Sequence, residues 1–142
     1  MSGRLEPRID LELQELREST SRLLDEINGA PLEPDADGDW TIELRGHRIL
    51  IRPAPKPMPH LFVWTGIVRY ADPTCLTELN DLNMATGWCR FIRTADGAVY
   101  VTAHLPAYSL TKRALHESIG AVGAGAAIAS PMIEAVYGGR AA

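Results

Sequence analysis

The sequence predicts an α+β fold, with helices packed on an antiparallel sheet of about five strands in the order α-β-β-β-α-β-β-α. Apolar residues recur every three or four positions in three segments, as in amphipathic helices, and follow strand patterns in five others. Glycine-containing links at Arg45-Gly46-His47 and Ala95-Asp96-Gly97 join neighbouring strand patterns and indicate hairpins. At 142 residues, 46% of them hydrophobic, the chain fits one folded domain spanning residues 1–142.

The first helix is predicted to end at Asn28, because Gly29 can take the left-handed conformation that closes a helix. Its apolar positions are Ile9, Leu13, Leu16, Thr20, Leu23 or Leu24, and Ile27. A turn-rich connector with four acidic residues follows. Their spacing is similar to that of a calcium loop, but no closing glutamate and no flanking helix pair are present, so we expect a solvated turn. These acidic residues are Glu33, Asp35, Asp37 and Asp39.

Two strands are predicted in WTIELRG and RILIR, followed by the proline-rich segment PAPKPMP, which we expect to be an extended connection. The third strand, HLFVWTGIVRY, is apolar on both faces. Either helices of this chain cover both faces, or a partner subunit or bound peptide covers one of them. In the second case the first helix is a candidate lid, and aromatic side chains anchor the partner. The candidate partner-binding residues are Phe62, Trp64, Val68 and Tyr70.

The second helix is predicted to begin near Asp72, a suitable N-cap, and to end at Thr86-Gly87. Two strands in WCRFIRT and AVYVTAH come next. The last helix is predicted from about residues 109–111 to Gly138-Gly139, with Pro131 kinking or splitting it. Its glycines Gly120, Gly123 and Gly125 have neither the order nor the position of a phosphate loop, so we interpret them as a close packing contact.

Two asparagines, Asn80 and Asn83, share one face of the second helix. We expect their amides to connect the end of this helix to the WCRFIRT strand, since helix ends leave backbone groups without partners. A polar clamp for a ligand amide is the functional alternative.

No catalytic, cofactor-binding or metal-binding residues are predicted. The four histidines lack ligand spacing, although His60 and His104 could meet at the ends of two strands. There is no GxSxG motif, and no combination of nucleophile, base and oxyanion donors can be named. Cys75 and Cys89 fit reduced cysteines of the cytosol, while a disulfide between them is the alternative.

The segment from Leu76 to Val122, which contains LNDLNMATGWCRFIRTADGAVYVTAHLP, resembles the YbjN family, once labelled bacterial sensory transduction regulators. Its helix with asparagines, aromatic strand, Asp-Gly hairpin, strand ending before Leu-Pro and long helix carry the resemblance. The order of elements along nearly the whole chain is similar to that of type III secretion chaperones of the CesT kind. The resemblance implies a secretion-chaperone-like fold, often dimeric, that binds extended segments of other proteins. The proline-rich link and the small-residue last helix depart from the family.

We therefore expect a non-enzymatic, cytoplasmic chaperone-like or adaptor protein that binds a segment of another protein, with a homodimer as one arrangement. The alternative is a small-molecule-binding regulatory domain with a pocket between the sheet and the last helix, lined by Asn80, Asn83 and His104. The 14 Lys and Arg residues are scattered and the net charge is −4, so nucleic acid is not an expected partner. No signal peptide or membrane insertion is expected, since the longest uncharged run, Ser118 to Ile133, is shorter than a membrane span.

Overall fold

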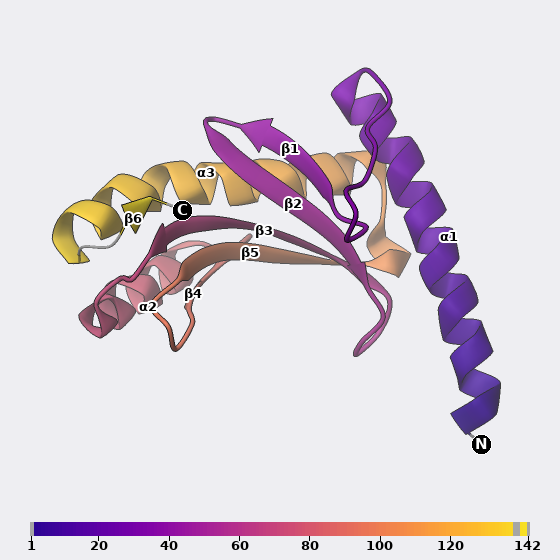
Figure 1. Ribbon diagram of the computed structural model, residues 1–142, viewed down its shortest axis with the longest axis horizontal. Coiled ribbons are helices and arrows are strands. Elements are labelled where there is room, and N and C mark those ends of the chain that lie inside the picture. Colours follow the sequence, from indigo (N-terminus) through magenta and orange to yellow (C-terminus); the bar gives the residue numbers. More distant parts are fainter. Residues whose placement is uncertain (1, 138–139, 142) are drawn as a thin grey trace.

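The computed structural model describes residues 2–137 and 140–141 and has the predicted α+β architecture (Figure 1). Its elements are, in chain order, α1 (Ser2–Asn28), β1 (Trp40–Leu44), β2 (His47–Ala54), β3 (His60–Arg69), the 3₁₀ helix η1 (Pro73–Cys75), α2 (Leu76–Ala85), β4 (Arg90–Arg93), β5 (Val99–Pro106), the 3₁₀ helix η2 (Ala107–Ser109), α3 (Lys112–Tyr137) and β6 (Arg140–Ala141). The sheet forms one layer and α3 crosses one of its faces as the second layer.

The sheet has the strand order β1-β2-β3-β5-β4, and all of its pairs are antiparallel. The short strand β6, which the sequence did not predict, pairs with Val68 and Arg69 of β3. Strand β2 continues through Pro53, although the proline-rich segment was expected to be a connection. Proline is tolerated there because β1 pairs with β2 only as far as Ile51, so Pro53 has β3 as its one neighbouring strand.

Glycine in the left-handed conformation makes both predicted hairpins. Arg45 and Gly46, with φ of 54° and 79°, form the two-residue link between β1 and β2. Gly97 has a φ of 93° in the link between β4 and β5. A Cβ atom at Gly97 would lie 3.0 Å from the Cα atom of Tyr70, so the adjacent backbone also requires a residue without a side chain.

The core lies between α3 and the face of the sheet turned toward it. Small residues of α3 let the helix approach closely, as the glycine pattern predicted. A Cβ atom at Gly123 would lie 2.8 Å from Leu44 Cδ2, and one at Gly125 would lie 3.0 Å from Cys89 Sγ. At Gly120 a Cβ atom would meet nothing within 4 Å, so only two of the three glycines serve this contact. The fully buried aliphatic residues here include Ile49, Ile51, Leu61, Val63, Val101, Val122 and Ile133.

Helix α3 is continuous through Pro131, so the proline does not split it. The predicted end at Gly138-Gly139 lies outside the described residues. By length and composition alone α3, with a mean hydropathy of 1.5, is long and apolar enough to cross a membrane. The uncharged run from Ser118 to Ile133 was too short to suggest this, because the helix extends beyond it at both ends. Its buried residues pack on β2, β3 and β5 and account for part of its apolar composition, since 39% of the apolar window is buried inside the molecule.

Asn83 joins α2 to the outer edge of β4. Its Nδ2 donates to the carbonyl oxygen of Phe91 at 2.9 Å, and the Phe91 N–H donates to its Oδ1 at 2.6 Å. One side chain thus satisfies both backbone groups of an edge residue, and the prediction for Asn83 is confirmed. Asn80 is exposed, and its side chain makes none of the hydrogen bonds found within the described residues. Asp72 caps η1, which leads directly into α2, by accepting from the Thr74 N–H at 2.9 Å.

Candidate functional site

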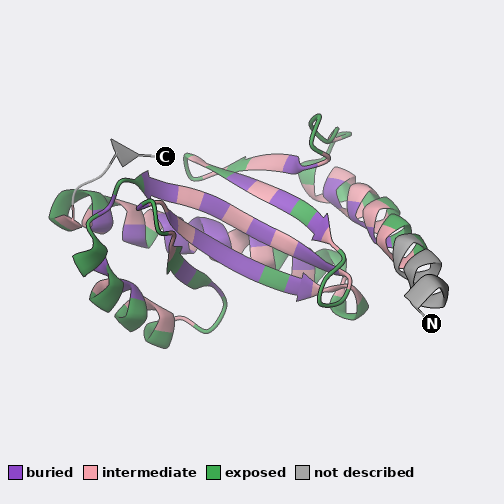
Figure 2. Ribbon diagram, turned by 60° about the horizontal axis from the view of Figure 1, so that its bottom comes forward, coloured by how far each residue is buried: buried purple, intermediate pink, exposed green. Residues whose placement is uncertain are grey.

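One face of the sheet has no helix across it within the described part of the chain. In Figure 2 this face is turned toward the viewer, α3 lies behind the sheet and α1 stands beside its end. Helix α1 contacts β2 and α3, so it is not a lid over this face. We call this surface the open face. Cross-strand pairing assigns to it Leu50, Arg52, Phe62, Trp64, Gly66, Tyr100, Thr102 and His104.

The open face carries a row of stacked rings. Phe62 and Trp64 stack with ring centroids 4.7 Å apart, and His104 stacks on Phe62 at 4.9 Å. His60 continues the row, with its ring centroid 5.2 Å from that of His104. The two histidines therefore meet, as the sequence suggested. Both Phe62 and Trp64 keep intermediate exposure to solvent, so the row is an apolar surface that remains accessible.

The row ends at Arg52, which a buried carboxylate holds in place. The guanidinium of Arg52 lies over the Trp64 ring, 5.2 Å from its centroid. Its Nε and Nη2 donate to the two carboxylate oxygens of Asp39 at 2.6 and 2.7 Å. These hydrogen bonds are the main reason why the pKa of Arg52 is raised above its ordinary value. A fixed guanidinium over an indole ring orients both side chains.

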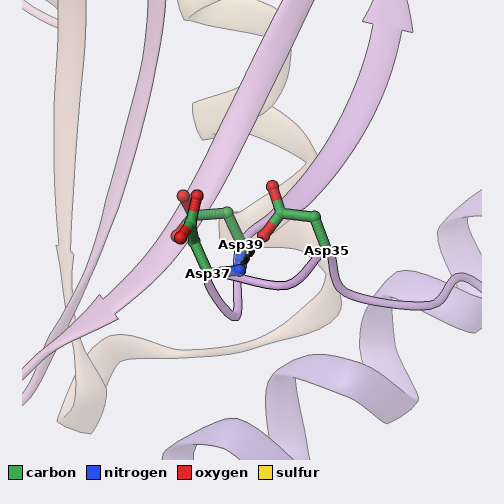
Figure 3. Close-up of side chains that lie close together, drawn as sticks. All are labelled: Asp35, Asp37 and Asp39. Carbon is green, nitrogen blue, oxygen red and sulfur yellow. Dashed lines mark hydrogen bonds between the residues drawn. The ribbon is translucent and has the colours of Figure 1, made fainter.

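Asp39 belongs to the acidic turn, shown in Figure 3 as three carboxylates on the loop before β1. Asp35 Oδ1 accepts from the backbone N–H groups of Asp37 and Asp39, both at 2.9 Å. One oxygen atom from each of the three carboxylates lies within 4.8 Å of the other two. Asp39 is only 3% exposed, so the expectation of a fully solvated turn was wrong at this residue. Its ion pair with Arg52 accounts for its burial.

Of the four predicted partner-binding residues, the open face includes Phe62 and Trp64. Gly66 pairs with Tyr100, but Val68 pairs with Val99, so a β-bulge shifts the alternation of side chains after Gly66. Val68 is consequently 1% exposed and belongs to the core, so its side chain is not part of the accessible surface predicted for it, although it borders the same hollow in this face as Trp64. Tyr70 lies beyond the end of β3, with a φ of 60°, and is 69% exposed.

The three residues that were predicted to line a small-molecule pocket between the sheet and the last helix do not come together. The amide of Asn83 is engaged by β4, and Asn80 is exposed. His104 pairs with Phe62 and so lies on the face opposite α3. Burial and the charges of His60 and Arg90 lower the pKa of His104, which favours its neutral form.

Both cysteines are free and buried, and burial is the main cause that raises the pKa of each thiol. A thiol with a raised pKa is a poor nucleophile near neutral pH. Neither cysteine therefore offers a reactive group on the open face.

A hollow in the open face lies next to Trp64, where Gly66 has no side chain. Its volume is about 430 Å³, and the rings of Trp64 and Tyr100 are among its walls. Sequence reasoning missed Tyr100 and Arg52 as members of this surface. The alternation of AVYVTAH and RILIR was visible, but the register that sets Tyr100 opposite Gly66 and Arg52 opposite Phe62 depends on pairing between strands far apart in the chain.

The fold of one antiparallel sheet packed on a long helix is of the kind found among secretion chaperones. One similar chain, from the crystal structure of the ExsC–ExsE complex, is 16% identical with a TM-score of 0.66, over 82% of this chain and 94% of that one. A chain from the complex of the Yersinia pestis type III secretion chaperone SycH with a stable fragment of YscM2 is 12% identical with a TM-score of 0.60, over 80% and 98% of the two chains. The HopA1–SchA chaperone–effector complex contains a chain with 12% identity and a TM-score of 0.61, over 87% and 97%.

These identities are low, so the three likenesses establish the fold alone. Residues 14–142 match TY-Chap1, the family described as "T3SS (YopN, CesT) and YbjN peptide-binding chaperone 1". The protein therefore belongs to this family, in agreement with the resemblance seen in its sequence. No curated protein matches the chain.

Proposed function

We propose that the protein is a non-enzymatic chaperone or adaptor, which binds an extended segment of another protein on the open face of its sheet. The observation that carries this proposal is the half-exposed stack of Phe62 and Trp64, which no helix covers within the described residues. Aromatic side chains supply much of the energy of protein interfaces, and contiguous exposed apolar surface is typical of them.

The relatives support the same kind of partner. The family is described as peptide-binding, and two of the similar structures are named as complexes of a chaperone with a protein fragment or an effector. The proposal includes a cytoplasmic location, which the two free cysteines support because thiols stay reduced there.

Site-specific photo-cross-linking in native lysate tests the proposal. A benzophenone side chain replaces Phe62 in one variant and Ile128 in the control, because Ile128 lies on α3 and is 66% exposed. We expect cross-linked peptides of a partner protein from position 62 and none from position 128. Thermal unfolding of both variants verifies that each is folded. Equal cross-linking at the two positions, or cross-linking at 128 alone, would contradict binding at the open face.

Self-association into a homodimer is the second part of the proposal. Large apolar side chains are exposed on α2 and in the loop after it, with Leu76 at 51%, Met84 at 81% and Trp88 at 77%. Such exposure fits a contact with a second copy of the chain. Sedimentation equilibrium should show a dimer that Met84→Lys dissociates and that Ile128→Lys leaves intact. A wild-type monomer at all concentrations would remove the dimer without affecting the proposal of segment binding.

A further inference from the structure

The hollow beside Trp64 is positively charged, although the whole chain carries a net charge of −4. Arg48 and Arg69 both line it and both are exposed. Glu43 is the one acidic residue among the described residues of its lining, where His47 also lies. The local charge is therefore opposite to that of the molecule, and charges further away than about 8 Å are screened at physiological salt.

Arg48 and Arg69 are not used by the fold. Other arginines are engaged: Arg52 by Asp39, and Arg93 by the Ala71 carbonyl oxygen at 2.9 and 3.1 Å. The side chains of Arg48 and Arg69, in contrast, make no ion pair or hydrogen bond with any described residue. Both residues border the hollow and have unused N–H donors, and a planar guanidinium fork matches a carboxylate.

Along β3, the hollow at Gly66 lies two residues from Trp64, which is the spacing between side chains on one face of an extended segment. Side chains of an extended chain return to the same face every two residues, about 7 Å apart. Trp64 and Gly66 on β3 have this same separation of two residues. A segment that runs along β3 with one apolar side chain on the Phe62 and Trp64 rings therefore brings its next side chain on that face to the hollow.

We propose that the segment bound by the open face carries an acidic residue, Asp or Glu, two positions from an aromatic or aliphatic residue. The apolar side chain packs on the rings of Phe62 and Trp64, and the carboxylate enters the hollow and accepts hydrogen bonds from Arg48 and Arg69. This inference rests on the proposed function and adds the chemistry of the partner to it. Arg52 is not part of this carboxylate site, because it does not line the hollow and its Nε and Nη2 already donate to Asp39.

A display library of random segments of about eight residues, the length of a typical strand or slightly more, tests the inference without a known partner. The library is selected on immobilised wild-type protein, on the double variant Arg48→Gln/Arg69→Gln, and on the control Arg113→Gln. Arg113 lies on α3, is 89% exposed and pairs with Glu117, so its loss removes one positive charge away from the open face. Thermal unfolding verifies that all three proteins are folded.

Wild type and Arg113→Gln should enrich acidic residues two positions from an apolar residue. Fluorescein-labelled copies of the selected peptides, measured by fluorescence anisotropy, should bind about tenfold more tightly than copies with Asn or Gln in place of the acid, because hydrogen bonds to charged groups are the strong ones. In Arg48→Gln/Arg69→Gln this preference should disappear, and in wild type it should shrink as salt is raised.

Apolar segments enriched without an acidic residue would overturn this inference and leave the proposed function intact. Acidic segments whose binding is unchanged in Arg48→Gln/Arg69→Gln would overturn the assignment of the hollow. If no segment is enriched on wild type, or if enriched segments bind Trp64→Ala as tightly as wild type, both the inference and segment binding at this face fail.

Discussion

Trp64 and Leu61 lie near each other on β3 but on opposite faces of the sheet, so replacing each by alanine separates binding from stability. Trp64→Ala removes the stack with Phe62, worth about 0.5–1.5 kcal/mol, and the contact with Arg52, worth about 0.5–1 kcal/mol. We expect the free energy of unfolding to fall by about 1–2.5 kcal/mol. Leu61 is fully buried, and Leu61→Ala should cost about 2–5 kcal/mol because it leaves a cavity in the core.

The effects on binding should be reversed. A central tryptophan of an interface contributes about 2 kcal/mol or more, so Trp64→Ala should weaken the affinity for a selected peptide by roughly 30-fold or more. Leu61→Ala should leave the affinity of the folded molecules nearly unchanged. Urea unfolding gives the stabilities, and fluorescence anisotropy at low temperature gives the affinities. If Trp64→Ala abolishes the circular dichroism spectrum of the fold, Trp64 belongs to the core and the open face is not a binding site.

Three further predictions concern stability. Asn83→Ala should lower the free energy of unfolding by about 1–3 kcal/mol in urea titration, because two backbone groups of β4 lose their partner. The control Asn80→Ala should change it by less than about 0.5 kcal/mol. Equal effects of the two substitutions would refute the role of Asn83. Gly123→Ala should lower the free energy of unfolding by about 1–3 kcal/mol through overpacking, while Gly120→Ala should raise it by about 0.5–1 kcal/mol. If thermal unfolding shows that Gly123→Ala stabilises the protein, the close contact at Gly123 is contradicted. The pKa of His104 is lower in the folded protein than in the unfolded chain, so the unfolded chain binds the proton more readily. The neutral His104 of the folded protein therefore contributes its full share of stability above about pH 6.5, and this share is lost as the pH falls through the lower folded pKa. Unfolding at pH 7 and pH 5 should therefore show a smaller loss of stability in His104→Gln than in wild type, and parallel losses would argue against it.

Local features of the chain were predictable where neighbouring residues decide them. Gly29 ends α1 with a φ of 75°, and Gly46 and Gly97 make the two hairpin links, because only a residue without a side chain takes these conformations at little cost. The interaction of Asn83 with β4 was also predictable, because an asparagine at a helix end lies next to backbone groups that need partners.

Features that depend on pairing between distant segments were not predictable. The bulge after Gly66 moved Val68 into the core. A glycine inside a strand is a local signal of a bulge, but which side chains the bulge moves to the other face follows only from the register with β5. The pairing of Arg52 with Asp39 joins β2 to the loop before β1, 13 positions away in the chain, and its formation requires β1 and β2 to be in register. The alternative hypothesis of a small-molecule pocket placed His104 beside the last helix, but the register places it on the opposite face, beside Phe62.

The sequence by itself determined that this protein is an α+β domain with a long small-residue helix and a central strand that is apolar on both faces, because periodicity and turn chemistry are local properties of the chain. It also carried the resemblance to the YbjN and secretion-chaperone group, which family membership supports. Only the tertiary structure decided that α3 covers one face of β3 and that the stack of Phe62 and Trp64 lies on the other. Which face of a strand is buried depends on where a helix distant in the chain packs. The close approach of Gly123 and Gly125 to Leu44 and Cys89 is part of that packing.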